Sequence, residues 1–106
     1  MSKNIVICCD GTGNEYSHEN TNIVKLFQII EKNTSHQLAF YDPGVGAFKQ
    51  KILTKTFGIG LREGVERAYR YLMNTYEEGD KVYFFGFSRG AFIMRSLSGL
   101  LAKCGL

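Results

Sequence analysis

The stretch that decides the fold of this chain is an apolar run that stops at a glycine, presents one serine and continues into a helical pattern: Lys81-Val82-Tyr83-Phe84-Phe85-Gly86-Phe87-Ser88-Arg89-Gly90-Ala91. The spacing Gly86-x-Ser88-x-Gly90 matches the nucleophile elbow G-x-S-x-G, in which a strand turns sharply into a helix and exposes a serine hydroxyl. Such a turn leaves no room for a Cβ two residues before or after the serine, so glycines are expected there. We therefore predict a strand over residues 81–86 and a helix that begins at the elbow.

Two more short apolar runs, residues 4–9 and 37–41, precede this stretch, and each ends at a turn sequence. The turns are Asp10-Gly11-Thr12-Gly13-Asn14 and Asp42-Pro43-Gly44-Val45-Gly46. Continuous apolar runs of this length are typical of parallel strands that are covered on both faces. Apolar residues at helical spacing predict helices over about 21–32 and 61–78. The glycines within residues 47–60 favour a mobile or substrate-facing loop there, although a short helix around 49–54 fits equally well.

The order strand, helix, strand, helix, strand, helix predicts an α/β fold with a parallel sheet and right-handed crossovers. In a doubly wound arrangement the first strand lies between the second and third. The helix at 21–32 then covers one face of the sheet and the other two helices cover the opposite face, giving three layers, α/β/α. The three turns that follow the strands share the carboxyl edge of the sheet, where ligands bind in such folds. No linker or internal repeat divides the 106 residues, so we expect one domain at most.

The composition is that of a globular protein with a formal net charge of +3. Its lysines and arginines are scattered and form no basic run, so we interpret them as solvated faces and expect no nucleic-acid partner. The three cysteines have neither a disulfide framework nor metal-ligand spacing, and no metal or cofactor is expected. The apolar stretch at the amino terminus is too short for a Sec signal, which favours cytoplasmic synthesis.

Ser88 is the candidate nucleophile, and the alternative is a serine that caps the last helix. The backbone N–H of Arg89 would form half of an oxyanion hole, because it lies one residue past the nucleophile at a helix N-terminus. The other half is expected from the glycine loop after the first strand, which otherwise is an ordinary polar turn: Gly11, Thr12 and Gly13.

Other residues support this candidate site. Asp10 either accepts hydrogen bonds that hold the glycine loop or binds a ligand, and Gly86 and Gly90 make room for the elbow. The Arg89 side chain either meets an anionic substrate group or ties down neighbouring loops. The two histidines, His18 and His36, have no pattern that assigns them a catalytic role.

A serine hydrolase also needs a general base, which follows the nucleophile in the order Ser, Asp or Glu, His when the serine sits on such an elbow. Residues 89–106 contain no Asp, Glu or His. The sequence as given therefore carries the nucleophile half of an active site without the base half.

Six segments together resemble one known family, in order and spacing: Cys9-Asp10-Gly11-Thr12-Gly13-Asn14, Thr21-Asn22-Ile23, Tyr41-Asp42-Pro43-Gly44-Val45-Gly46, Ala68-Tyr69-Arg70-Tyr71-Leu72, Gly79-Asp80-Lys81-Val82-Tyr83 and Gly86-Phe87-Ser88-Arg89-Gly90-Ala91. The chain resembles the domain of unknown function that forms the catalytic part of type VI secretion phospholipase effectors. The resemblance implies an α/β-hydrolase fold, Ser88 as nucleophile, hydrolysis of esters and, in the effector members, phospholipid substrates. Residues 1–106 correspond to the N-terminal part of one such domain, truncated before the triad acid and histidine, so we expect them to be inactive alone.

The resemblance also implies partners and a destination. These are transient contact with a membrane surface through regions beyond these residues, a downstream chain or a cognate immunity protein, and export by a type VI system if the protein is an effector. Two other functions stay open. One is a non-catalytic remnant or interaction module that keeps the hydrolase fold. The other is a phosphate- or nucleotide-binding domain that uses residues 10–14, which is weaker because neither G-x-x-x-x-G-K-[ST] nor G-x-G-x-x-G follows the first strand.

Overall fold

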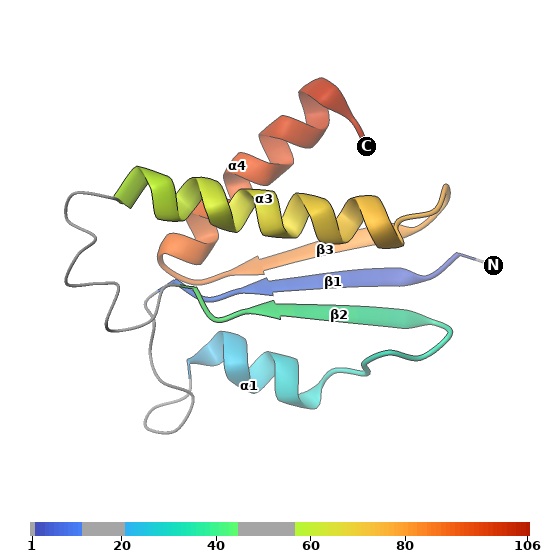
Figure 1. Ribbon diagram of the computed structural model, residues 1–106. Coiled ribbons are helices and arrows are strands. Elements are labelled where there is room, and N and C mark those ends of the chain that lie inside the picture. The colour runs from blue at the N-terminus through green and yellow to red at the C-terminus, as the bar shows by residue number, and fades with distance from the viewer. Residues whose placement is uncertain (1, 12–20, 45–56) are drawn as a thin grey trace.

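The computed structural model describes residues 2–11, 21–44 and 57–106. In this part of the chain three strands alternate with three helices (Figure 1), in the order β1 (Asn4–Cys9), α1 (Asn22–Ile29), β2 (Gln37–Asp42), α3 (Phe57–Thr75), β3 (Lys81–Gly86) and α4 (Arg89–Cys104). The three predicted strands are confirmed, with β2 one residue longer than expected. The loop or short helix expected around residues 49–54 lies outside the described residues.

The strands form one parallel sheet in the order β2-β1-β3, as the sequence predicts. Asn4 pairs with Gln37 on one side and Lys81 on the other, and the register continues without a bulge to Cys9. The central strand is buried on both faces, with Ile5 and Ile7 fully inaccessible. This is the environment that a continuous apolar run requires.

Helices cover both faces of the sheet, in the predicted division (Figure 1). On one face α3 and α4 pack over β1 through a core that consists of Ile5, Ile7, Cys9, Ala68, Leu72, Ile93, Met94 and Leu97. On the other face α1 packs over β1 and β2 through a smaller core of Val6, Cys8 and Ile23. The described part of the chain thus has three layers, α/β/α, consistent with an α/β-hydrolase-like fold.

Helix α1 ends three residues earlier than predicted, at Ile29. Ile30 is already extended, with φ −78° and ψ 156°. The Lys32 ammonium group donates hydrogen bonds to the carbonyl oxygens of Phe27 at 2.7 Å, Gln28 at 3.3 Å and Ile30 at 3.1 Å. A cation that binds the last carbonyls of a helix stabilises its end, and here it does so from outside the helix.

Helix α3 begins at Phe57, so the prediction that residues 57–60 belong to a loop is wrong. That prediction depended on two glycines, Gly58 and Gly60, each of which costs about 1 kcal/mol relative to alanine within a helix. The rest of α3 packs against the sheet and α4, with Ala68 and Leu72 buried. Most helical stability in proteins comes from such packing, which here outweighs the propensity of one turn.

At the amino edge of the sheet, Asp80 is buried just before β3 and links it to the start of β1. Its carboxylate accepts hydrogen bonds from the Lys3 backbone N–H at 2.9 Å and the Lys3 ammonium group, and from the Glu77 N–H at 2.9 Å. The hydrogen bond from the Glu77 N–H stabilises the turn between α3 and β3. Helix α3 ends at Thr75, earlier than the predicted end near residue 78. No helix in the described ranges is long and apolar enough to cross a membrane.

Candidate active site

The elbow lies between β3 and α4, at the carboxyl edge of the sheet. Ser88 has φ 59° and ψ −121°, a conformation that residues with a Cβ rarely adopt. Its side chain is exposed and makes no capping hydrogen bond to α4. A helix-capping serine has an extended backbone and accepts a hydrogen bond from the first turn, so this geometry does not support the capping alternative. Strain of this kind concentrates at functional sites.

Both elbow glycines are required by close backbone contacts, as the sequence predicts. A Cβ on Gly86 would lie 2.6 Å from the Cα of Ala91 and from the carbonyl oxygen of Gly90. A Cβ on Gly90 would overlap the carbonyl oxygen of Cys9. The elbow therefore packs directly on the end of the central strand, and the Phe87 N–H continues that contact by donating to the same Cys9 oxygen at 3.1 Å.

Gly11, directly after β1 and Asp10, lies against the backbone of the elbow. A Cβ on it would be 2.5 Å from the carbonyl oxygen of Phe87 and 2.8 Å from the nitrogen of Gly90, and it would overlap the nitrogen of Arg89. The structure thus brings together Ser88, Arg89 and Gly11 from the set that the sequence singled out. Thr12 and Gly13 lie outside the described residues.

Asp10 is buried, with 3% of its surface exposed. Its backbone N–H donates to the carbonyl oxygen of Asp42 at 2.8 Å, which extends the pairing of β1 with β2 by one residue. Its Oδ2 accepts hydrogen bonds from the hydroxyl groups of Thr21 at 2.6 Å and Tyr41 at 2.9 Å. These contacts join the end of β1 to β2 and to the start of α1, which favours a supporting role for Asp10 over ligand binding.

A second buried carboxylate at this edge, Asp42, was not singled out from the sequence as a site residue. Its Oδ1 accepts from the Gly44 N–H and its Oδ2 from Arg67 Nε, both at 2.9 Å. Gly44 has φ +81°, and a Cβ there would lie 2.5 Å from the carbonyl oxygen of Asp10. The Asp-Pro-Gly sequence signals the turn, since aspartate accepts from the backbone two residues on. The ion pair with Arg67 joins residues 25 apart and has no local signal.

The other candidates contribute less. The Arg89 side chain is half-buried and has interaction partners within the protein. His36 is exposed, and its carbonyl oxygen accepts from the Asn4 N–H at 2.8 Å, at the amino edge of the sheet and opposite the elbow. His18 lies outside the described residues. No described histidine therefore lies at the carboxyl edge.

The cysteines are not alternative nucleophiles at this edge. Cys8 and Cys9 are buried, and burial raises the pKa of Cys8 to about 11 and that of Cys9 to about 12. Both are therefore neutral thiols at physiological pH, whereas the thiolate is the reactive form. Among the described residues no group of three or more His, Cys, Asp or Glu side chains is arranged to hold a metal ion.

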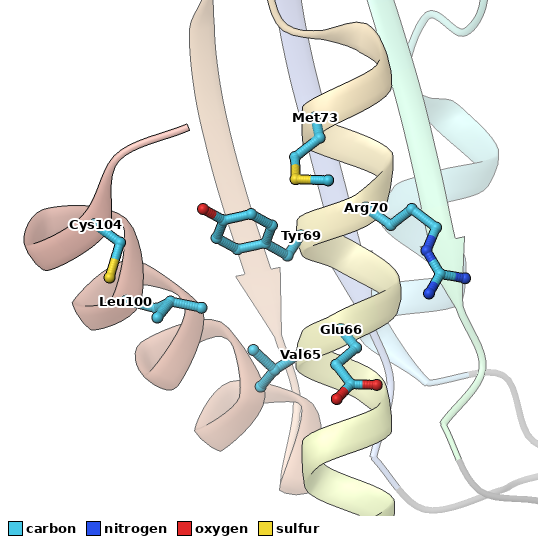
Figure 2. A pocket seen from close by; sticks show the side chains of 7 residues that line it. All are labelled: Val65, Glu66, Tyr69, Arg70, Met73, Leu100 and Cys104. Carbon is cyan, nitrogen blue, oxygen red and sulfur yellow. The ribbon is translucent and has the colours of Figure 1, made fainter.

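A separate hollow of about 350 Å³ lies between α3 and α4, lined by Val65, Glu66, Tyr69, Arg70, Met73, Leu100 and Cys104 (Figure 2). Figure 2 shows Tyr69 directed from α3 toward α4, whereas Arg70 points to the other side of α3. Leu100 lies eleven residues after Arg89, roughly 16 Å along a helix. This hollow is therefore remote from the elbow.

A family model described as "T6SS, Phospholipase effector Tle1-like, catalytic domain" matches residues 3–106. The matched range spans the end of β1, the buried carboxylates Asp10, Asp42 and Asp80, and the elbow. The chain belongs to this family. The resemblance inferred from six segments of sequence is thereby confirmed.

One similar protein is the uncharacterized protein YEL023C of Saccharomyces cerevisiae, which is 37% identical over 122 aligned residues. The alignment covers 98% of this chain and 18% of the yeast protein. The chain thus spans less than a fifth of the length of that relative, consistent with a partial domain. No solved structure gives a significant match.

Proposed function

We propose that this chain carries the nucleophile half of a serine ester hydrolase that cleaves phospholipids, with Ser88 as the nucleophile. The observation that carries the proposal is the backbone of Ser88, held at φ 59° between β3 and α4 with no capping bond on its side chain. Neither helix capping nor packing accounts for a strained, exposed serine flanked by two sterically required glycines. Membership of a family named for phospholipase effectors supports an ester of a lipid as the substrate.

The chemistry follows from the position of the serine. Ser88 Oγ attacks the carbonyl carbon of the ester, and its proton passes to a general base. The tetrahedral intermediate expels the alcohol, which takes up that proton, and leaves an acyl-enzyme that water hydrolyses. The Arg89 N–H is a donor for the oxyanion at the N-terminus of α4, and the segment that begins at Gly11 supplies the second donor. No cofactor is needed for this reaction.

The general base is expected from another part of the full-length protein. The described residues bring no histidine to the carboxyl edge, and residues 89–106 contain no Asp, Glu or His. Without a base, a serine hydroxyl is a weak nucleophile. We therefore expect residues 1–106 alone to be inactive toward esters.

Labelling by a fluorophosphonate probe tests the role of Ser88 in the full-length protein. The probe forms a covalent bond to an activated serine, so the wild-type protein becomes labelled. Ser88→Ala removes the labelling, and the matched control Ser98→Ala, an exposed serine on α4, keeps it. Wild-type protein that does not react, or equal labelling of Ser88→Ala, would contradict the proposal.

The substrate class is tested with the same variants. We expect the full-length protein to release fatty acid from phospholipid in mixed micelles faster than it hydrolyses a soluble short-chain ester. Ser88→Ala should lower the rates of both reactions by a factor of about 10⁴ or more, because the variant lacks the nucleophile. A preference for the soluble ester would contradict the proposed lipid substrate but would leave the proposal of a serine hydrolase standing.

A further inference from the structure

Three elements meet at the carboxylate of Asp10. Thr21 precedes α1 and Tyr41 lies on β2, and both donate their hydroxyl hydrogens to the same oxygen of Asp10, at 2.6 Å and 2.9 Å. The other oxygen, Oδ1, is buried and has no hydrogen-bond partner among the described residues. Among the described residues, the donors that orient this carboxylate are therefore the two hydroxyl groups at Oδ2.

Both donors are themselves fixed. The Thr21 oxygen accepts the N–H of Val24 at 3.2 Å and so caps α1, which uses a lone pair and leaves its hydrogen for Asp10. The ring of Tyr41 lies against Phe27 of α1, with 5.4 Å between ring centroids. Neither hydroxyl has to be ordered when substrate binds, as a preorganised site requires.

The position of Asp10 determines that of the next peptide. Gly11 is confined between two stretches of backbone: the elbow, which leaves no space for a Cβ, and Gly44, which packs on the Asp10 and Gly11 backbone. A Cβ added to Gly44 would lie 3.3 Å from the carbonyl carbon of Gly11. A small rotation of Asp10 would therefore shift Gly11 relative to the nitrogen of Arg89.

We propose that Thr21 and Tyr41 are positioning residues, which act through Asp10 to hold the Gly11 peptide in register with the Arg89 N–H for oxyanion stabilisation. This inference rests on the proposed function, because it concerns the reaction of Ser88. It adds two residues that do not touch the substrate yet control the rate of the chemical step. Transition-state stabilisation by fixed donors depends on geometry, so a misplaced donor slows the step while leaving substrate binding intact.

The test is the second-order rate constant for labelling of Ser88 by the fluorophosphonate in the full-length protein. The phosphonyl oxygen gains negative charge during the attack, so this rate reports on the oxyanion donors. Tyr41→Phe removes one hydroxyl and keeps the ring, and Thr21→Val removes the other. Each should react about tenfold more slowly than wild type, less than the hundredfold or larger loss expected when an oxyanion donor itself is removed.

Two controls separate positioning from stability. Thr21→Ser keeps the hydroxyl and should restore the wild-type rate, and Tyr76→Phe, at a partly exposed tyrosine after α3, should not change it. In assays with phospholipid, Tyr41→Phe should lower kcat by the same factor and leave KM unchanged, which a purely structural role would not do. Thermal melting of each variant checks that it is folded. If Thr21→Val does not fold, the comparison of Tyr41→Phe with Tyr76→Phe is the test.

The outcomes are distinct. Slow labelling of folded Tyr41→Phe and Thr21→Val, together with the wild-type rate for Thr21→Ser, supports the inference. Folded Tyr41→Phe that reacts at the wild-type rate overturns it and leaves the proposed function intact. Wild-type protein in which Ser88 does not react overturns both.

Discussion

At the scale of single residues, Ser88 combines exposure with an unfavourable backbone. A non-glycine residue at φ 59° and ψ −121° carries strain of about 1–3 kcal/mol, which the packing of the elbow on β1 must offset. Stability alone would favour a glycine at this position. A serine there is explained if its hydroxyl is needed.

Ser88→Gly should therefore stabilise the protein while it removes labelling. Relief of strain outweighs the entropy that glycine adds to the unfolded chain, for a net gain of about 1 kcal/mol in the free energy of unfolding. Urea denaturation followed by circular dichroism measures it. The control Ser96→Gly, at an exposed position within α4, should lower the same free energy by about 0.5 kcal/mol. Equal losses in both variants would mean that Ser88 is not strained.

Substitution by alanine at two glycines of α4 should change the free energy of unfolding in opposite directions. Gly90→Ala places a methyl group on the carbonyl oxygen of Cys9 in the buried strand β1, and it should lower the free energy of unfolding by about 2–3 kcal/mol. Gly99→Ala meets nothing within 4 Å, and it should raise that free energy by up to about 1 kcal/mol through helix propensity. Denaturation of the two variants in parallel measures the difference, and a stable Gly90→Ala would contradict the close packing of elbow and strand.

At the scale of elements, β1 and β3 are joined at their amino ends by Lys3 and Asp80. The side-chain hydrogen bond from Lys3, followed by the backbone N–H donors of Lys3 and Glu77, lowers the pKa of Asp80 to about 2. An unfolded chain has an aspartate pKa of about 3.9. The folded state thus favours the charged form, and the stabilisation is complete above about pH 4 and is lost as the pH falls toward 2.

Asp80→Asn should remove this pH dependence. The variant should be less stable than wild type at pH 6, and its stability should fall less steeply between pH 5 and pH 2, because no carboxylate is protonated at this position. Urea midpoints measured at intervals of half a pH unit give the slopes. Glu78→Gln, which removes an exposed carboxylate in the same turn, should keep the wild-type slope. A parallel fall in wild type and Asp80→Asn would contradict the lowered pKa.

The strands were predictable because each is a short apolar run that ends at a turn sequence, and strand order followed from the parallel crossovers. The helix ends were less predictable. Lys32 binds the last carbonyls of α1 from outside the helix. Helix α3, which packs on the core through Ala68 and Leu72, extends back through Gly58 and Gly60. Local patterns do not contain these contacts.

The elbow and Gly11 were predictable from spacing, because glycine is the residue that a close backbone approach demands. The contacts of the buried carboxylates were not. Asp80 binds Lys3 across 77 residues of sequence, and Asp10 binds Tyr41 across 31. Such pairs become visible only when the sheet brings strand ends together.

At the scale of the whole molecule, the described sheet is covered unevenly. Val82 and Phe84 of β3 pack under α3 and α4, so the alternating residues Tyr83 and Phe85 face the α1 side. There α1 covers β1 and β2, and Tyr83 and Phe85 remain 43% and 40% exposed. In the described part of the chain the outer edge of β3 also has no neighbouring strand. An open edge beside exposed aromatic rings promotes association.

We therefore expect residues 1–106, when expressed alone, to self-associate at micromolar concentration. Phe85→Lys adds a charge to the exposed face of β3 and should shift the protein toward monomer in sedimentation velocity. Met73→Lys changes an exposed apolar residue on α3, away from β3, and should leave the association unchanged. Monomeric wild type, or equal effects of the two substitutions, would contradict this interpretation.

The central claim is that Ser88 is an activated nucleophile, and the most direct measurement locates the fluorophosphonate adduct in the sequence. Trypsin cleaves after Lys81 and Arg89, which isolates residues 82–89, a peptide with Ser88 as its single serine. For the folded full-length protein we predict one adduct per chain, on this peptide, assigned to Ser88 by fragmentation and absent after prior denaturation. Folded protein whose peptide 82–89 carries no adduct would contradict the account.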